Sequence, residues 1–241
     1  MLSVERLGVL LAPKDENHAK FNAGMVKQGD KVHMVYRWSK QNGIATDANE
    51  KKTGIVYSDD FVSYAELTPE GKLVSDLDER GLIKYYIENP KTPVYAQDPR
   101  IVEFEGEYII FFVRYDLKIC RVGMARTKNF KKIEPIGIIP SNDWDKDAFI
   151  LPERINGKIV YIHRIEPNIQ IDYFDSFDEM IDPEYWNHYN EKIHEQADQK
   201  RDRNYLHQAD IRQPAFILLS SDTIQVSILL CVYGSYFQQG V

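Results

Sequence analysis

Cysteine is scarce in this chain, with only Cys120 and Cys231 among 241 residues. Two cysteines do not make the disulfide framework of a small secreted domain, so we expect a reducing compartment, the cytoplasm. Basic residues are also outnumbered: 30 Lys and Arg stand against 37 Asp and Glu, for a net charge of −7. No basic stripe offsets this balance, which argues against nucleic acid as a partner.

Long uninterrupted apolar segments are missing as well. The most apolar part, residues 215–241, contains Ser220, Asp222 and Gln225, which excludes a membrane span. Residues 7–12 are apolar, but they lack a preceding basic segment and a small-residue cleavage site, so we expect no signal peptide. A hydrophobic fraction of 43% still provides a core for one domain of this length.

A β-hairpin pattern occurs three times in the chain. In each copy an Asn or Asp precedes a short strand, a Gly marks the turn, and a second apolar strand ends at an Arg. The copies cover residues 22–37, 98–114 and 147–164. Asp98 and Asp147 stand 49 residues apart, close to the ~40–50 residues of one propeller blade.

A second element recurs between the hairpins, because residues 54–61 resemble residues 122–130 in their strand pattern and polar turn. Two elements that recur in the same order predict an all-β propeller, and an unrelated β-sandwich with similar hairpins is the alternative. We expect residues 38–53 to form a polar loop and residues 68–93 an insertion. The whole chain, residues 1–241, is interpreted as one propeller domain.

The pattern changes after Tyr173. Residues 182–203 have helical composition, with Pro183 near a first turn and aromatic residues on one face, so one helix is predicted there. Residues 215–241 form an atypical, strand-like tail without the landmarks of the repeat. We therefore expect an incomplete propeller. Its open strand edges must be covered, so either another chain completes it, as in a homo-oligomer, or the protein is marginally stable.

The innermost strands of a propeller surround one central channel, and the repeats deliver equivalent positions to its rim. The start and end of an antiparallel hairpin lie at the same sheet edge, so acids and cations meet there. The candidate positions are Asn22, Asp98 and Asp147 at strand starts, and Arg37, Arg114 and Arg164 at strand ends. The alternative for any single one is a turn-capping acid or a solvated arginine.

Four blocks stand out in order along residues 7–190. They are Phe21-Asn22-Ala23-Gly24, Gln97-Asp98-Pro99-Arg100-Ile101, Lys146-Asp147-Ala148 with Leu151-Pro152-Glu153, and His163-Arg164. Together they resemble glycoside hydrolase family 130, the β-mannoside phosphorylases and some β-mannosidases, which are five-bladed propellers. The resemblance implies that Asp98 is the general acid. It also implies sugar contacts from Asn22, Arg37, Arg100 and Asp147, and phosphate contacts from Lys146, His163 and Arg164.

The activity implied by this resemblance is inverting phosphorolysis of β-mannosidic bonds, which gives mannose 1-phosphate. Cleavage with inversion needs an acid on the leaving oxygen and a nucleophile on the opposite face of the sugar. A phosphate nucleophile needs no second catalytic carboxylate, but cations must hold it. Inorganic phosphate is then the co-substrate, with no other cofactor. The implied sugar substrate is a β-mannooligosaccharide or a mannosyl-glucose or mannosyl-N-acetylglucosamine type of disaccharide.

No metal site is expected, because the spacings of His188, His194 and His207 do not place them on one helix face.

Two other functions stay open. One is a hydrolase of the same fold, in which water replaces phosphate and a second carboxylate is the base. Lys146 and Arg164 favour the phosphorylase, since a hydrolase has no use for paired cations; alternatively, Arg164 pairs with Glu166 or Asp147. The other is a non-catalytic or vestigial carbohydrate-binding fragment, because the family's Gly- and Pro-rich block, Gly-Trp strand and Tyr-His pair are not found in residues 200–241.

Overall fold

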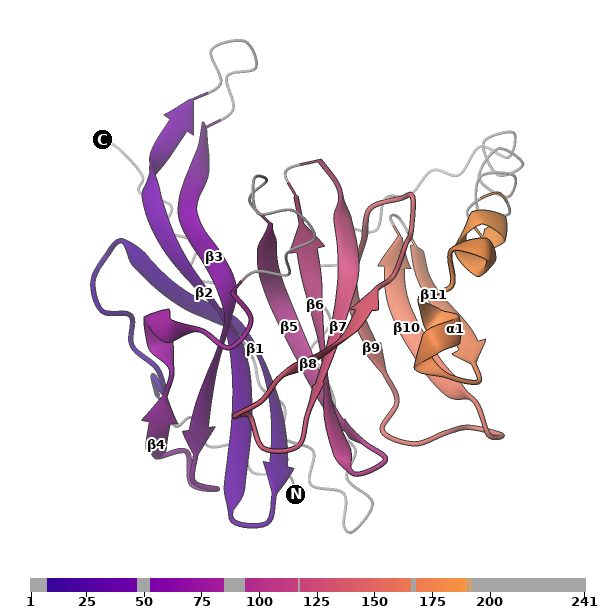
Figure 1. Cartoon of the computed structure of the whole chain (residues 1–241). Helices are drawn as coiled ribbons and strands as arrows, with labels where there is room; N and C mark the ends of the chain where they lie inside the picture. Colours follow the sequence, from indigo (N-terminus) through magenta and orange to yellow (C-terminus); the bar gives the residue numbers. More distant parts are fainter. Residues whose placement is uncertain are drawn as a thin grey trace, which may run out of the picture. The chain divides into compact units, whose positions relative to one another are not determined.

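The structure is a computed structural model that describes residues 8–46, 53–84, 94–116, 118–165, 168–189 and 191 (Figure 1). The chain divides into two compact units, Met1–His194 and Glu195–Val241. All described residues belong to the first unit. Most of the predicted helix beyond residue 189, and the whole tail at residues 215–241, therefore lie outside the described residues.

The described strands form three antiparallel sheets, which we call blades 1, 2 and 3. Blade 1 has the order β1-β2-β3-β4, with β1 His18–Gln28, β2 Lys31–Thr46, β3 Thr53–Leu67 and β4 Leu73–Asp76. Blade 2 has the order β5-β6-β7-β8, with β5 Tyr95–Phe104, β6 Glu107–Tyr115, β7 Cys120–Thr127 and β8 Glu134–Ile138. Blade 3 has the order β9-β10-β11, with β9 Asp145–Ile150, β10 Ile159–Ile165 and β11 Asn168–Phe174. Sheets whose sequential strands pair as neighbours are typical of propeller blades, which confirms the all-β prediction.

The first strands of the blades contact one another, β1 with β5 and β5 with β9. Each of them is interrupted by a β-bulge at the same place. The first residue of each bulge has a left-handed backbone, with φ of 49° at Asn22, 48° at Asp98 and 56° at Asp147. Asn and Asp tolerate this conformation better than most residues, which explains why each repeat begins with one of them.

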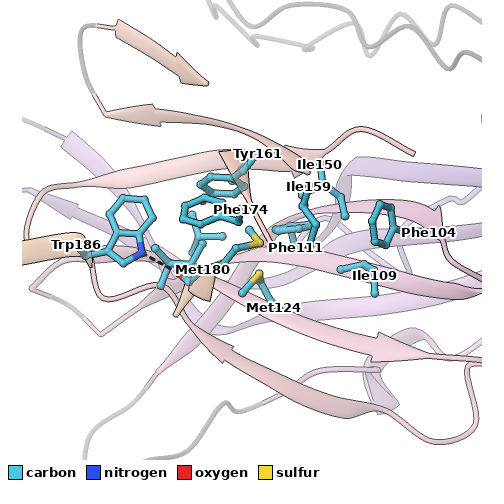
Figure 2. Close-up of a cluster of buried hydrophobic side chains, with 13 residues drawn as sticks. Phe104, Ile109, Phe111, Met124, Ile150, Ile159, Tyr161, Phe174, Met180 and Trp186 are labelled. Atoms are coloured by element: carbon cyan, nitrogen blue, oxygen red, sulfur yellow. Dashed lines mark hydrogen bonds between the residues drawn. The ribbon is translucent and has the colours of Figure 1, made fainter. Parts of the chain in front are cut away.

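The blades pack through apolar faces. Between blades 2 and 3, Phe111 and Met124 pack with Tyr161 and Phe174 in one buried cluster (Figure 2). Trp186 is fully buried at the end of this cluster and donates a hydrogen bond from Nε1 to the backbone oxygen of Met180, at 2.8 Å. A second cluster packs blade 1 on blade 2. These two clusters fix the positions of neighbouring blades relative to one another.

The predicted helix is confirmed where the structure describes it. Residues 183–189 are helical, and Asp182 Oδ1 accepts a hydrogen bond from the backbone N–H of Glu184 at 3.0 Å. A separate short helix, α1 (Phe177–Met180), precedes it, and Ser176 is its N-cap residue. The sequence pattern did not distinguish this short helix from the loop before the longer one.

Two expectations for blade 1 were wrong. The polar loop predicted at residues 38–53 is mostly strand, because β2 extends to Thr46 and pairs with β3 along its length. Sheet pairing outweighs the polar composition of this segment. The insertion predicted at residues 68–93 contains β4, which pairs with β3 as the outermost strand of the blade. At four residues, β4 is too short for a periodic pattern to show in the sequence.

Gly24 lies where blade 1 approaches blade 2 most closely. A Cβ built on Gly24 would lie 3.2 Å from Arg100 Cα, Ile101 N and Pro99 O, all backbone atoms. Overpacking of this kind costs roughly 1–3 kcal/mol, and Gly→Ala returns only about 0.4–1 kcal/mol through the unfolded chain. We therefore expect Gly24→Ala to lower the free energy of unfolding, measured in urea. Lys27→Ala, at an exposed position of β1, is the control, and equal stability of the two variants would contradict a tight contact.

Candidate active site

The bulges bring predicted residues of blades 1 and 2 together around Asp98. Asn22 Nδ2 donates a hydrogen bond to Asp98 Oδ1 at 2.5 Å, and Arg37 Nη1 donates to the same oxygen at 3.0 Å. The Asp98 side chain is 17% exposed, so solvent or a ligand can reach it. No protein donor contacts Oδ2 within the described part of the chain. That oxygen is therefore available to a bound molecule.

Asp60 holds Arg37 from the other side, and the sequence analysis did not identify this residue. Arg37 Nε donates to Asp60 Oδ1 at 2.7 Å, and Arg37 Nη2 donates to Oδ2. Ser39 Oγ and Gln97 Nε2 also donate to this carboxylate, at 3.0 and 2.7 Å. Asp60 is 3% exposed, so its function is to orient Arg37 and not to meet a ligand.

The charges of this pair follow from burial and hydrogen bonding. Burial raises the pKa of Asp60, and the hydrogen bonds from Arg37, Ser39 and Gln97 oppose that rise. Burial by itself would lower the pKa of Arg37, but its hydrogen bonds and charge interactions with Asp60 and Asp98 raise it above the ordinary value. Arg37 is thus a permanent cation beside Asp98.

Asp147 joins blades 2 and 3 in a similar way. Arg100 Nη2 lies 3.3 Å from Asp147 Oδ1, and Arg164 Nη2 lies 2.7 Å from Asp147 Oδ2. Arg100 also donates through Nη1 to the backbone oxygens of Asp98 and Pro99, both at 3.1 Å. The ion pair between Arg164 and Asp147, one of the alternatives considered for this arginine, is therefore present.

Lys146 and Arg164 are directly opposite each other in the ladder between β9 and β10. Cross-strand partners of an antiparallel sheet project from the same face, so the two cations share one side of blade 3. Among the described residues, the charged side chains at this rim include the cations Arg37, Arg100, Lys146 and Arg164 and the carboxylates Asp60, Asp98 and Asp147. Guanidinium and ammonium groups gathered at one rim are suited to contact an anion.

Arg114 does not occupy the position expected from the repeat. Arg37 and Arg164 pair with Phe21 and Lys146, the residues just before the bulges. In blade 2 the residue before the bulge is Gln97, and its partner is Val113. Arg114 is one residue further along, which turns its side chain to the other face of the sheet. It forms an ion pair there with Asp116, so its predicted equivalence to the other two arginines was wrong.

His163 also differs from its predicted role. It lies on β10 opposite the bulge of Asp147, but its side chain faces the interior and is 1% exposed. Nδ1 is 3.0 Å from both carboxylate oxygens of Asp145, and Nε2 is 2.9 Å from Asp172 Oδ2. Neighbouring residues of a strand point to opposite faces, so His163 points away from the face that carries Arg164. The expected phosphate contact of His163 is incompatible with this position.

Among the residues that the structure describes, no group of His, Cys, Asp and Glu side chains is arranged to hold a metal ion. No helix in this part of the chain is long and apolar enough to cross a membrane. His188 is exposed on the helix of residues 183–189, whereas His194 and His207 lie outside the described residues.

Antiparallel blades whose first strands bring an aspartate and several arginines to one rim define a β-propeller with a polar site at that rim. The chain belongs to glycoside hydrolase family 130, because the family model described as β-1,4-mannooligosaccharide phosphorylase matches residues 9–206.

Two curated relatives come from Thermoanaerobacter sp. A β-1,2-mannobiose phosphorylase is 31% identical over 163 residues, which cover 65% of this chain and 50% of the relative. A 1,2-β-oligomannan phosphorylase is 29% identical over 196 residues, which cover 73% of this chain and 58% of the relative. The chain thus spans between half and three fifths of the length of the curated relatives that it matches.

Solved structures share the fold at low sequence identity. The β-1,2-mannobiose phosphorylase of Listeria innocua, in complex with β-1,2-mannobiose, matches with a TM-score of 0.50 at 17% identity, covering 69% of this chain and 59% of that one. A family 117 glycoside hydrolase of Zobellia galactanivorans matches with a TM-score of 0.53 at 16% identity, covering 69% and 56%. These matches confirm the propeller prediction over part of the chain, and at such identities they show the fold alone.

Proposed function

We propose that this chain catalyses inverting phosphorolysis of β-mannosidic bonds, with Asp98 as general acid and inorganic phosphate as nucleophile. The observation that carries the proposal is the carboxylate of Asp98. Its Oδ1 is fixed by Asn22 and Arg37, while Oδ2 is available at a rim that also carries Lys146 and Arg164. The chain spans only part of the length of its relatives, so phosphorolysis is proposed for this chain and is not carried over from them.

In this mechanism Asp98 Oδ2 carries the proton and delivers it to the oxygen of the leaving sugar as the glycosidic bond breaks. A phosphate oxygen attacks the anomeric carbon from the opposite face, so a β-mannoside yields α-mannose 1-phosphate. Phosphate also brings negative charge to a rim that carries Arg37, Arg100, Lys146 and Arg164. These cations stabilise the charge of the bound phosphate.

Asn22, Arg37, Arg100 and Asp147 are the proposed sugar contacts. All four are polar, lie at the bulges or beside them, and are already fixed by one another or by Asp98. Groups held in this way bind hydroxyls without first losing side-chain freedom, which favours tight positioning of a small sugar. The relatives named for β-1,2-mannobiose and 1,2-β-oligomannan make a β-1,2-linked mannoside the first substrate to test.

The hydrolase is the weaker alternative, because both carboxylate oxygens of Asp147 already contact arginines, Oδ1 that of Arg100 and Oδ2 that of Arg164. A non-catalytic carbohydrate-binding protein is the other alternative.

The proposal is tested by incubating the purified protein with β-1,2-mannobiose and with β-1,4-mannobiose, each with and without phosphate. Products are identified by NMR, which distinguishes α-mannose 1-phosphate from free mannose. Phosphate-dependent release of α-mannose 1-phosphate is the expected result. Free mannose alone would identify a hydrolase, and binding without any product would identify a carbohydrate-binding protein.

A further inference from the structure

A buried acid–histidine–acid cluster lies directly behind the two cations proposed to hold phosphate. It consists of His163 between Asp145 and Asp172, with Tyr189 Oη 3.3 Å from His163 Nε2. The side chains of His163 and Asp145 are fully buried, and that of Asp172 is 15% exposed. The proposed mechanism does not use this cluster, although a buried charged group is costly unless it is paired.

The cluster is joined to the cation pair through the backbone. His163 directly precedes Arg164 on β10, and Asp145 directly precedes Lys146 on β9. The carboxylate of Asp145 also accepts a hydrogen bond from the backbone N–H of Arg164. A shift of His163 or Asp145 therefore moves the backbone from which the two cations project.

The hydrogen-bond geometry favours a charged imidazole. A neutral histidine has one donor nitrogen, whereas both nitrogens of His163 face carboxylates that can only accept when ionised. An imidazolium donates in both directions and supplies a positive charge beside the buried Asp145 and the partly exposed Asp172. His163 in this state links all three strands of blade 3, since Asp145 is on β9 and Asp172 is on β11.

We propose that His163 is a positioning residue of the phosphate site. Clamped between Asp145 and Asp172, it fixes β9 and β10 so that Lys146 and Arg164 keep the spacing that one small anion needs. This inference rests on the proposed function, because it assumes that the two cations bind phosphate.

The electrostatics of the cluster agree with the proposal. Burial by itself lowers the pKa of His163, but Asp145 and Asp172 outweigh it and raise the pKa from 6.5 to about 9. Tyr161 and Tyr189 also face the ring, and Tyr185 donates a hydrogen bond to Asp172. Burial raises the pKa of all three tyrosines, so they stay neutral over this range. The stabilisation by His163 is therefore complete below pH 6.5 and is lost as the pH rises through about 9.

The test compares wild type with His163→Gln and Asp172→Asn. The probe is inorganic phosphate, and the readouts are the rise in melting temperature with phosphate and the phosphate KM against kcat. Misplacement of binding groups by about 1 Å costs on the order of 100-fold, so we expect phosphate binding to weaken by roughly 10- to 100-fold in both variants. In Asp172→Asn the phosphate response should also fall at a lower pH than in wild type, because one carboxylate no longer holds the proton.

Tyr161→Phe is the matched control. The rings of Tyr161 and His163 stack with their centroids 4.6 Å apart, and both side chains are buried. The Tyr161 hydroxyl has no hydrogen-bond partner within the described residues. Its loss should leave phosphate binding unchanged. If His163→Gln fails to fold, Asp172→Asn provides the test. Asp172 is partly exposed, so its substitution is less disruptive to the fold. Variants that bind phosphate as wild type does would overturn this inference alone. A wild type without any response to phosphate would overturn both it and the phosphorolysis proposal.

Discussion

Asp98→Asn is expected to abolish turnover while the protein stays folded. The amide has the size of the carboxylate, and its oxygen can still accept the hydrogen bonds that Asn22 and Arg37 donate to Oδ1. Only the ability to deliver a proton to the leaving sugar oxygen is lost. General acid catalysis contributes roughly 10²–10⁴-fold, so kcat for mannose 1-phosphate release should fall by at least about 100-fold.

The matched control for this variant is Asp116→Asn. Asp116 is also an aspartate bound by an arginine, with Arg114 Nη1 2.8 Å away, but it lies beyond the end of β6 and not at a bulge. This ion pair, together with backbone hydrogen bonds, outweighs burial and lowers the pKa of Asp116 to about 2. We expect Asp116→Asn to change stability and to leave kcat unchanged. Near-normal activity of a folded Asp98→Asn protein would remove Asp98 from the mechanism.

Arg164→Lys is expected to weaken phosphate use far more than Lys146→Arg does. An arginine can bind two phosphate oxygens in a planar fork, whereas a lysine acts as a point charge. Arg164 must also keep its contact with Asp147, at 2.7 Å, while it holds the anion. A lysine at this position has one ammonium group for both partners. A charge-assisted hydrogen bond contributes about 1.5–3 kcal/mol, so phosphate KM should rise roughly 10- to 100-fold in Arg164→Lys and only a few-fold in Lys146→Arg.

Phosphate KM is measured at saturating mannoside, and the phosphate-dependent rise in melting temperature gives a second readout without turnover. Arg154→Lys is the control, because Arg154 forms its ion pair with Glu105 away from the bulges. It should leave both quantities unchanged. An equal effect of Arg164→Lys and Lys146→Arg would show that charge alone, and not the fork of Arg164, determines phosphate binding.

The blades could be predicted from the sequence because each one repeats a local signal. An Asn or Asp is needed where the strand turns through a left-handed residue, so Asn22, Asp98 and Asp147 are visible as landmarks without any knowledge of tertiary structure. The acid of the proposed site is one of these landmarks. The grouping of site residues at one rim followed from the hairpin geometry alone.

Features that depend on register could not be predicted in the same way. Arg114 looks equivalent to Arg37 in the sequence, and only the ladder shows the offset of one residue that turns it away. Asp60 on β3 binds Arg37 on the neighbouring strand β2. The register between these strands sets the contact, and no fixed spacing in the sequence indicates it. His163 stands beside Arg164 in the sequence, and which face it occupies is decided by the pleat and the bulge opposite it.

The two acids at the bulges take their partners from neighbouring blades. Asp98 of blade 2 accepts both of its side-chain hydrogen bonds from Asn22 and Arg37 of blade 1, and Asp147 of blade 3 is bound by Arg100 of blade 2. No single blade therefore contains both Asp98, the proposed acid, and the residues that orient it. Slow opening between two blades, which hydrogen–deuterium exchange can detect, would abolish the proposed activity before any single sheet unfolds. The lifetime of the proposed activity at high temperature should therefore depend on the strength of the contacts between blades and not on that of the strand ladders within them.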